Sequence, residues 1–231
     1  MSNMRVVILG SGSGTNAEAI LSAASASQLG PTQVVAVYSD VKNAGILEKA
    51  ARYEVKNSHL SSPSQLATLN GKSENLWIET IKEDVPDLIV LAGFMRILKG
   101  PFLKAFSGKI INLHPSLLPS FPGLEAIRQA FARGVKITGC TIHWVNEVVD
   151  GGEIIAQAPV RVMPGDTYEL LEQKIHGAEH VVLPSVIRDL AIGATPFLGV
   201  CSRWLSRCPR SSSLRWKISY VKWLPVTGVC K

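Results

Sequence analysis

The chain has 231 residues, of which 46% are apolar, and a net charge of +6. That length suits one large or two small domains with a buried core, and no stretch reaches the roughly 20 apolar residues of a membrane-spanning helix. The first residues lack the apolar length and cleavage site of a secretory signal, so we expect a cytoplasmic protein that is not bound to a membrane.

Composition divides the chain near residue 194. Seven basic and no acidic residues lie between 200 and 231, so the preceding 199 residues carry a net charge of −1 and no nucleic-acid partner is required. Three of the four cysteines lie in the same segment, without a histidine and without the spacing of a zinc site. We predict a folded domain over 1–194, a basic tail over 195–231, and no metal.

Short β-branched apolar runs alternate with longer helix-like segments in the first half of the chain. Strands are predicted at 5–9, 33–38, 87–91 and 109–113, and helices at 17–24, 45–53 and 74–83. This alternation predicts an α/β fold with a Rossmann-like, doubly wound and mainly parallel sheet.

The pattern changes after Gly134. Two extended segments, 137–145 and 153–162, predict an antiparallel pair added to the sheet edge, with the turn-rich segment between them exposed. A last helix is predicted from Asp166, whose spacing to Glu169 is typical of a capping box, to about Asp189. Pro184 is expected to kink that helix.

The first predicted strand leads into the segment Gly10-Ser11-Gly12-Ser13-Gly14-Thr15-Asn16. Glycines let a backbone turn tightly beside an anion, and the N–H groups at a helix start bind it, so we predict a phosphate site at Gly14, Thr15 and Asn16. The dinucleotide fingerprint is incomplete, although Asp40 occupies the place of a ribose-binding acid. The alternative is a structural turn in which Thr15 or Asn16 caps the helix.

Asn112 and His114 lie two residues apart at the carboxyl end of a predicted strand, hence on one face, where open α/β sheets bind ligands. An amide donor and a titratable ring suit a reaction in which a carbonyl oxygen becomes an oxyanion and a proton moves. Asp150, in a loop with two glycines, is the candidate carboxylate to orient His114. Each residue taken singly also has an ordinary structural explanation, and His143 is interpreted as structural.

Four separated motifs resemble those of the phosphoribosylglycinamide formyltransferase family. They are Ser11 to Asn16, Leu91 to Leu98, Asn112 to Pro119, and Asp150 to Gly152, in that order between Met4 and Ala191. The resemblance implies transfer of a formyl group from 10-formyltetrahydrofolate, a co-substrate, to the amine of phosphoribosylglycinamide, without a metal.

The resemblance also implies roles for individual residues. Asn112 and His114 would stabilise the oxyanion, and Asp150 would hold His114 and assist proton transfer through water. Gly14, Thr15 and Asn16 would bind the substrate phosphate, and His176 and Glu179 its phosphoribosyl part. The folate would contact Met95, Arg96, Ile97, Leu98, Asn112, Asn146, Glu147, Val148, Val149 and Asp150, with Lys72 as the basic residue of the poorly matching region 62–73.

Two other functions stay open at this point. A formyltetrahydrofolate hydrolase would use the same Asn, His and Asp residues and pass the formyl group to water. A nucleotide-binding regulatory module would use only the glycine-rich loop and Asp40. The sequence also leaves a homodimer open.

Overall fold

The computed structural model describes residues 3–62 and 68–194, so the predicted basic tail lies outside the described residues. Within them, seven strands form one sheet in the order β3-β2-β1-β4-β5-β6-β7. The strands are β1 (Met4–Leu9), β2 (Thr32–Ser39), β3 (Asn57–His59), β4 (Leu88–Leu91), β5 (Ile110–His114), β6 (Ile137–Trp144) and β7 (Ile154–Arg161). β1 to β5 are parallel, and β6 and β7 are antiparallel additions at one edge, which confirms the predicted fold class.

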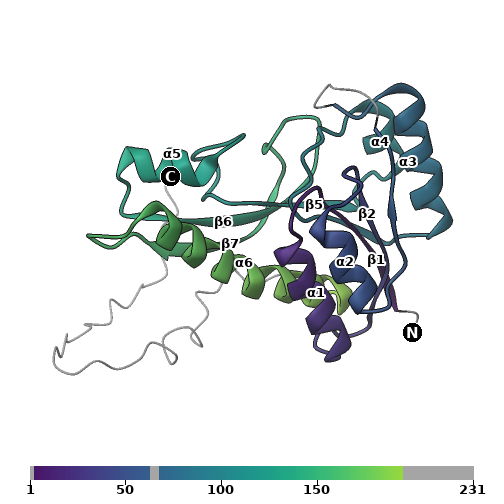
Figure 1. Cartoon of the computed structure of the whole chain (residues 1–231), viewed down its shortest axis with the longest axis horizontal. Coiled ribbons are helices and arrows are strands. Elements are labelled where there is room, and N and C mark those ends of the chain that lie inside the picture. The colour runs from purple at the N-terminus through teal and green to yellow at the C-terminus, as the bar shows by residue number, and fades with distance from the viewer. Residues whose placement is uncertain (1–2, 63–67, 195–231) are drawn as a thin grey trace, which may run out of the picture. The chain divides into compact units, whose positions relative to one another are not determined.

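Helices cover both faces of the sheet (Figure 1). They are α1 (Thr15–Ser25), α2 (Gly45–Arg52), α3 (Gly71–Glu83), α4 (Gly100–Ala105), α5 (Ala126–Arg133) and α6 (Tyr168–Ala191). Val6 and Ile8 of β1 pack with α1, α2 and α6, whereas Val7 and Leu9 pack with α3 and α4. Two covered faces explain why the central strands are apolar throughout.

Three short elements, β3, α4 and α5, were not predicted. β3 has three residues, too few to show alternation, and α4 has six. α5 has eight residues and begins after Glu125, whose φ of 56° is unusual for a residue other than glycine. β3 and α4 carry too little periodic signal for a prediction.

The capping prediction for the last helix was wrong by one residue. The cap of α6 is Thr167, whose side chain accepts a hydrogen bond from the Leu170 amide at 3.3 Å. Asp166 instead accepts from the Met163 amide at 2.8 Å and forms an ion pair with Lys174. α6 continues past Pro184 to Ala191, and no helix among the described residues is long and apolar enough to cross a membrane.

The strand order places the predicted motifs at one edge of the sheet. The chain winds from β1 out to β3 and returns on the other side of β1 with β4 and β5. Loops after β1 and after β4 therefore diverge at a topological switch point, the place where open α/β sheets bind ligands. The glycine-rich loop follows β1, the segment Met95 to Leu98 follows β4, and His114 ends β5.

Candidate active site

The structure brings Asn112, His114 and Asp150 together at the end of β5. His114 is buried, and its Nδ1 lies 3.3 Å from Oδ2 of Asp150, which approaches from the loop between β6 and β7. Asn112 Nδ2 lies 3.5 Å from Oδ1 of the same carboxylate. One carboxylate thus contacts both side chains that alternation along the strand placed on one face.

The backbone conformation of Asp150 and a hydrogen bond to its carboxylate fix the position of this side chain. Its φ of 53° is in the left-handed region, and its Oδ2 accepts a hydrogen bond from the Gly123 amide at 2.7 Å. Burial alone would raise the pKa of this carboxyl, but the hydrogen bond from the Gly123 amide and the nearby His114 hold it below its usual value. Asp150 is therefore set up to act as an anion beside His114.

The two glycines after Asp150 are required by the close approach of neighbouring groups. They do not supply the left-handed turn, since Asp150 itself takes that conformation. A Cβ at Gly152 would lie 1.6 Å from the Trp144 carbonyl oxygen, and one at Gly151 would lie 2.5 Å from Val148 Cγ1. These positions need glycine because other groups come too close, not because of the turn.

The second nitrogen of His114 also faces an oxygen. Nε2 lies 2.8 Å from the backbone carbonyl of Phe121, in the loop that follows the β5 motif. Both ring nitrogens of His114 thus face hydrogen-bond acceptors. The Phe121 carbonyl oxygen occupies the place in which a substrate oxygen would accept a hydrogen bond from Nε2–H.

His143 is the site residue that the sequence reasoning missed. It pairs directly with Asn112 across β5 and β6 and is 2% exposed. Its Nε2 lies 3.2 Å from Asn112 Nδ2 and 3.7 Å from Asp150 Oδ1, the latter long for a hydrogen bond. The predicted antiparallel pair was the signal that could have identified His143. A strand that pairs with β5 must place one of its own residues opposite Asn112.

The glycine-rich loop forms a tight turn into α1. Gly14 has φ 76° and is itself the residue that precedes α1, so neither Thr15 nor Asn16 caps this helix. A Cβ at Gly14 would lie 2.5 Å from Ile46 Cα, so the loop needs glycine for packing against α2 as well as for conformation. Thr15 is exposed at the helix start, where the free backbone N–H groups of a helix favour an anion.

Asn16, His176 and Glu179 meet although 163 residues separate the first from the last. Asn16 Nδ2 donates to Glu179 Oε2 at 2.9 Å, and His176 Nδ1 lies 2.9 Å from the same oxygen. The contact with Glu179 raises the pKa of His176, partly against the effect of burial. Oδ1 of Asn16 is buried with no hydrogen-bond partner among the described residues, so this cluster has an unused acceptor beside the glycine-rich loop.

The segments predicted to contact the folate expose apolar side chains. Met95 is 61% exposed, and Val148 and Val149 in the loop before Asp150 are more than half exposed. Asn146 orders that loop, because its Oδ1 accepts from the Val148 amide at 2.9 Å and its Nδ2 donates to the Gly151 carbonyl. Apolar surface on both sides of the Asn112 end of β5 suits a flat aromatic ligand.

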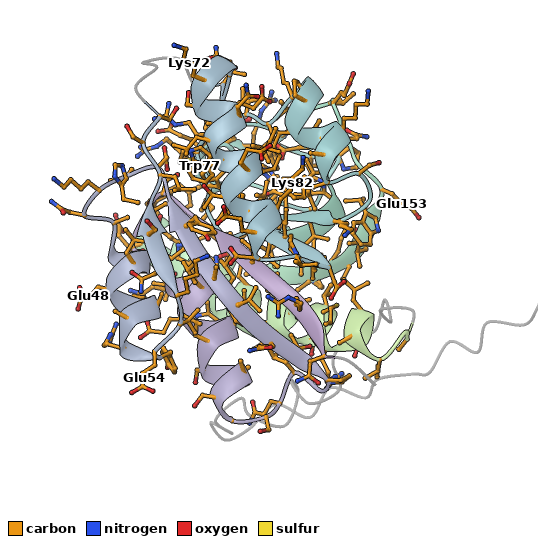
Figure 2. All side chains as sticks on the ribbon, turned by 90° about the vertical axis from the view of Figure 1, so that its right-hand side faces the viewer. Glu48, Glu54, Lys72, Trp77, Lys82 and Glu153 are labelled. Carbon is orange, nitrogen blue, oxygen red and sulfur yellow. The ribbon has the colours of Figure 1, made fainter. Side chains whose placement is uncertain are left out.

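The remaining folate candidates lie around this surface. Ile97 forms a bridge with Thr68, immediately before α3, and Leu98 is buried. Lys72 is exposed in the first turn of α3, at the outer end of the helix in Figure 2, whereas Trp77 of the same helix is buried. Glu147 borders an open cavity of about 720 Å³, whose other walls come from α4 and Ser107. That cavity is separate from the Asn112 cluster and was not predicted.

Asp40 does not have the position that a nucleotide-binding module needs. Its Oδ1 accepts from Ser11 Oγ at 2.6 Å and its Oδ2 accepts from Arg96 Nε at 2.6 Å, and its side chain is 3% exposed. A carboxylate engaged in this way is not free for a ribose hydroxyl. The structure therefore disfavours the nucleotide-binding alternative.

The fold and site together are those of a one-carbon group transferase: an open α/β sheet with an antiparallel edge, an amide and imidazole pair at the end of β5, and a glycine-rich loop after β1. The chain belongs to the formyl transferase family, whose sequence model matches residues 4–187. Within that family it is similar to phosphoribosylglycinamide formyltransferases, which confirms the resemblance found in the motifs. The enzyme of Bacillus subtilis is 39% identical over 186 residues, which cover 80% of this chain and 94% of that one.

Two solved structures have the same fold. Glycinamide ribonucleotide transformylase 1 from Symbiobacterium toebii superposes with a TM-score of 0.77 at 44% identity and covers 83% of this chain and 89% of that chain. The corresponding protein from Geobacillus kaustophilus has a TM-score of 0.75 at 42% identity, with 82% and 99% covered. The trifunctional purine biosynthetic protein adenosine-3 of Drosophila pseudoobscura is 41% identical over 194 residues, but this chain spans only 14% of its length.

Proposed function

We propose that the chain transfers the formyl group of 10-formyltetrahydrofolate to the amine of phosphoribosylglycinamide, a step of de novo purine synthesis in the cytoplasm. The observation that carries the proposal is the contact of Asp150 with both Asn112 and His114 at the end of β5. Membership of the formyl transferase family and the similarity to phosphoribosylglycinamide formyltransferases support it.

Each predicted residue has a role in this scheme. The phosphate binds the N–H groups at Gly14, Thr15 and Asn16, and the ribose lies against His176 and Glu179. The folate lies against Met95, Arg96, Ile97, Leu98, Asn112 and the loop Asn146, Glu147, Val148, Val149 and Asp150, with Lys72 at its edge. The reaction uses no metal.

The amine nitrogen attacks the formyl carbon, and the carbonyl electrons move to the oxygen. Asn112 Nδ2 and His114 Nε2 donate hydrogen bonds to this oxyanion, which replaces the Phe121 carbonyl as the acceptor for Nε2. When the carbonyl re-forms, the bond from carbon to N10 of the folate breaks, and the proton lost by the amine ends on N10. Asp150 holds His114 through Nδ1 and assists the proton transfer through water.

The test is an assay of the full chain with both substrates. Formylated phosphoribosylglycinamide and tetrahydrofolate are expected as products, and His114→Ala should lower kcat by about 10² or more. His59→Ala is the matched control, because His59 ends β3 away from the Asn112 cluster. Unchanged turnover in His114→Ala would exclude the scheme, and formate release without an amine acceptor would favour the hydrolase.

A further inference from the structure

Asp40 is a buried carboxylate to which the proposed chemistry gives no role. It follows β2, two strands away from β4, and its side chain is 3% exposed. Burying a carboxylate is costly unless hydrogen bonds and an opposite charge compensate for it. Ser11 and Arg96 supply that compensation, each at 2.6 Å, and both contacts are short charge-assisted hydrogen bonds.

The two partners of Asp40 belong to the two proposed substrate sites. Ser11 is part of the phosphate loop after β1, and Arg96 lies in the folate-facing segment after β4. The two segments also contact each other directly: the Met95 amide donates to Ser11 Oγ at 2.9 Å, and the Ser11 amide donates to the Gly93 carbonyl at 3.0 Å. Asp40 thus connects the segments at the switch point of the sheet.

The hydroxyl of Ser11 connects the Asp40 carboxylate to the glycine-rich loop and to the segment that contains Met95. A hydroxyl has one hydrogen to donate, and Ser11 donates it to Asp40, which leaves the lone pairs on Oγ directed at the Met95 amide. Removing the negative charge would weaken both the hydrogen bond from Ser11 and the ion pair with Arg96. Both segments would then change together.

We propose that Asp40 is a positioning residue that holds the phosphate loop and the segment Met95 to Leu98 in one arrangement, so that binding of either substrate favours binding of the other. The proposal rests on the proposed function for the identity of the two substrates. When two segments share one anchor, the first ligand orders both, and the second ligand finds its site already ordered. The coupling must be reciprocal, because it is a property of the equilibrium.

The test compares Asp40→Asn with a control at a second buried carboxylate. Asn keeps the size of Asp but replaces one acceptor by a donor that faces Ser11 or Arg96. Asp84→Asn is the matched control, since Asp84 is 8% exposed and also accepts two short contacts, from Tyr38 Oη at 2.6 Å and Lys56 Nζ at 2.7 Å. Asp84 follows α3 before β4, at the opposite end of β4 from the candidate site.

Two measurements read the effect. Steady-state kinetics should show both KM values raised about tenfold in Asp40→Asn with kcat changed less, since one charge-assisted hydrogen bond typically shifts an equilibrium by that amount or more. Calorimetry should measure the Kd of tetrahydrofolate with and without phosphoribosylglycinamide. In the wild type each ligand should lower the Kd of the other, and in Asp40→Asn the ratio of the two Kd values should be near one. Asp84→Asn should lower Tm and leave both KM values and the coupling unchanged.

Three results would overturn the proposal: KM values within twofold of the wild type, a rise in only one KM, or the same loss of coupling in Asp84→Asn. Ser11→Ala, which keeps the ion pair of Asp40 with Arg96, provides the same test if Asp40→Asn does not fold. A wild type that binds both ligands without forming a formylated product would reject the proposed function alone, because calorimetry would still decide the role of Asp40.

Discussion

Asn112 Nδ2 lies 3.2 Å from Nε2 of His143, on the neighbouring antiparallel strand. The other ring nitrogen, Nδ1, lies 2.9 Å from the Trp144 carbonyl oxygen, which can only accept. In the tautomer that satisfies both contacts, Nδ1 carries the hydrogen and Nε2 accepts from Asn112. His143 thereby sets which way the Asn112 amide faces.

We expect His143→Ala to lower kcat about tenfold with little change in either KM, because the amide loses the acceptor that orients it and one neutral hydrogen bond is typically worth about 0.5–1.5 kcal/mol. Single-turnover kinetics on the purified variant would measure this. His143→Gln, which keeps an acceptor, should recover part of the rate. A rise in KM without loss of kcat would show that His143 acts in binding instead.

The lowered pKa of Asp150 predicts how the enzyme responds to acid. A carboxyl whose folded pKa lies below its ordinary value of 3.8 favours folding above that value, and this contribution is lost as the pH falls through the folded pKa. Asp150 should therefore stay ionised through mildly acidic pH. A carboxyl NMR titration of Asp150 should give a midpoint below 3.8. A midpoint above that value would contradict the role of the surrounding donors.

His176 predicts a pH dependence at the phosphate end of the site. Its pKa is raised above 6.5, mainly by Glu179, so its charge is fully present below 6.5 and is lost as the pH rises through the raised value. The KM for phosphoribosylglycinamide should therefore increase with pH above 6.5, measured by steady-state kinetics at fixed folate.

His176→Gln is the control for this dependence. It should remove the pH dependence of that KM and leave the KM for the folate unchanged, because glutamine can contact Glu179 but does not titrate. If the wild type and His176→Gln gave parallel pH profiles, the titrating group would have to be another residue.

Substitution of Gly152 by alanine should affect stability in the opposite direction from the same substitution at Gly177. Gly152→Ala should destabilise the chain by roughly 1–3 kcal/mol or more, since the added Cβ would lie 1.6 Å from the Trp144 carbonyl oxygen. Gly177→Ala should instead stabilise by about 0.5–1 kcal/mol, because Gly177 lies within α6 with open space around its Cα. Urea unfolding followed by circular dichroism would compare them, and equal stability of the two variants would contradict the argument.

Much of the fold could be predicted because it depends on local patterns. The alternation of apolar runs with helical segments predicted β1, β2, β4 and β5, and the change after Gly134 predicted the antiparallel pair. The short elements β3 and α4 could not be predicted, since a strand of three residues and a helix of six show no period. The cap of α6 was misassigned because Asp166 and Thr167 are adjacent and both are common cap residues.

The sequence alone determined which residues share a face and which loop contains the glycines. Asn112 and His114 face the same way because side chains alternate along any strand, and the turn before α1 needs Gly14 whatever surrounds it. Asp150 was already the predicted partner of His114, whereas only the tertiary structure decided the other partners: His143 for Asn112, and Asp40 for both Ser11 and Arg96. Those contacts join residues 29 to 56 positions apart in the sequence. The order and register of the strands bring these residues within hydrogen-bond distance, and no local sequence pattern contains that information.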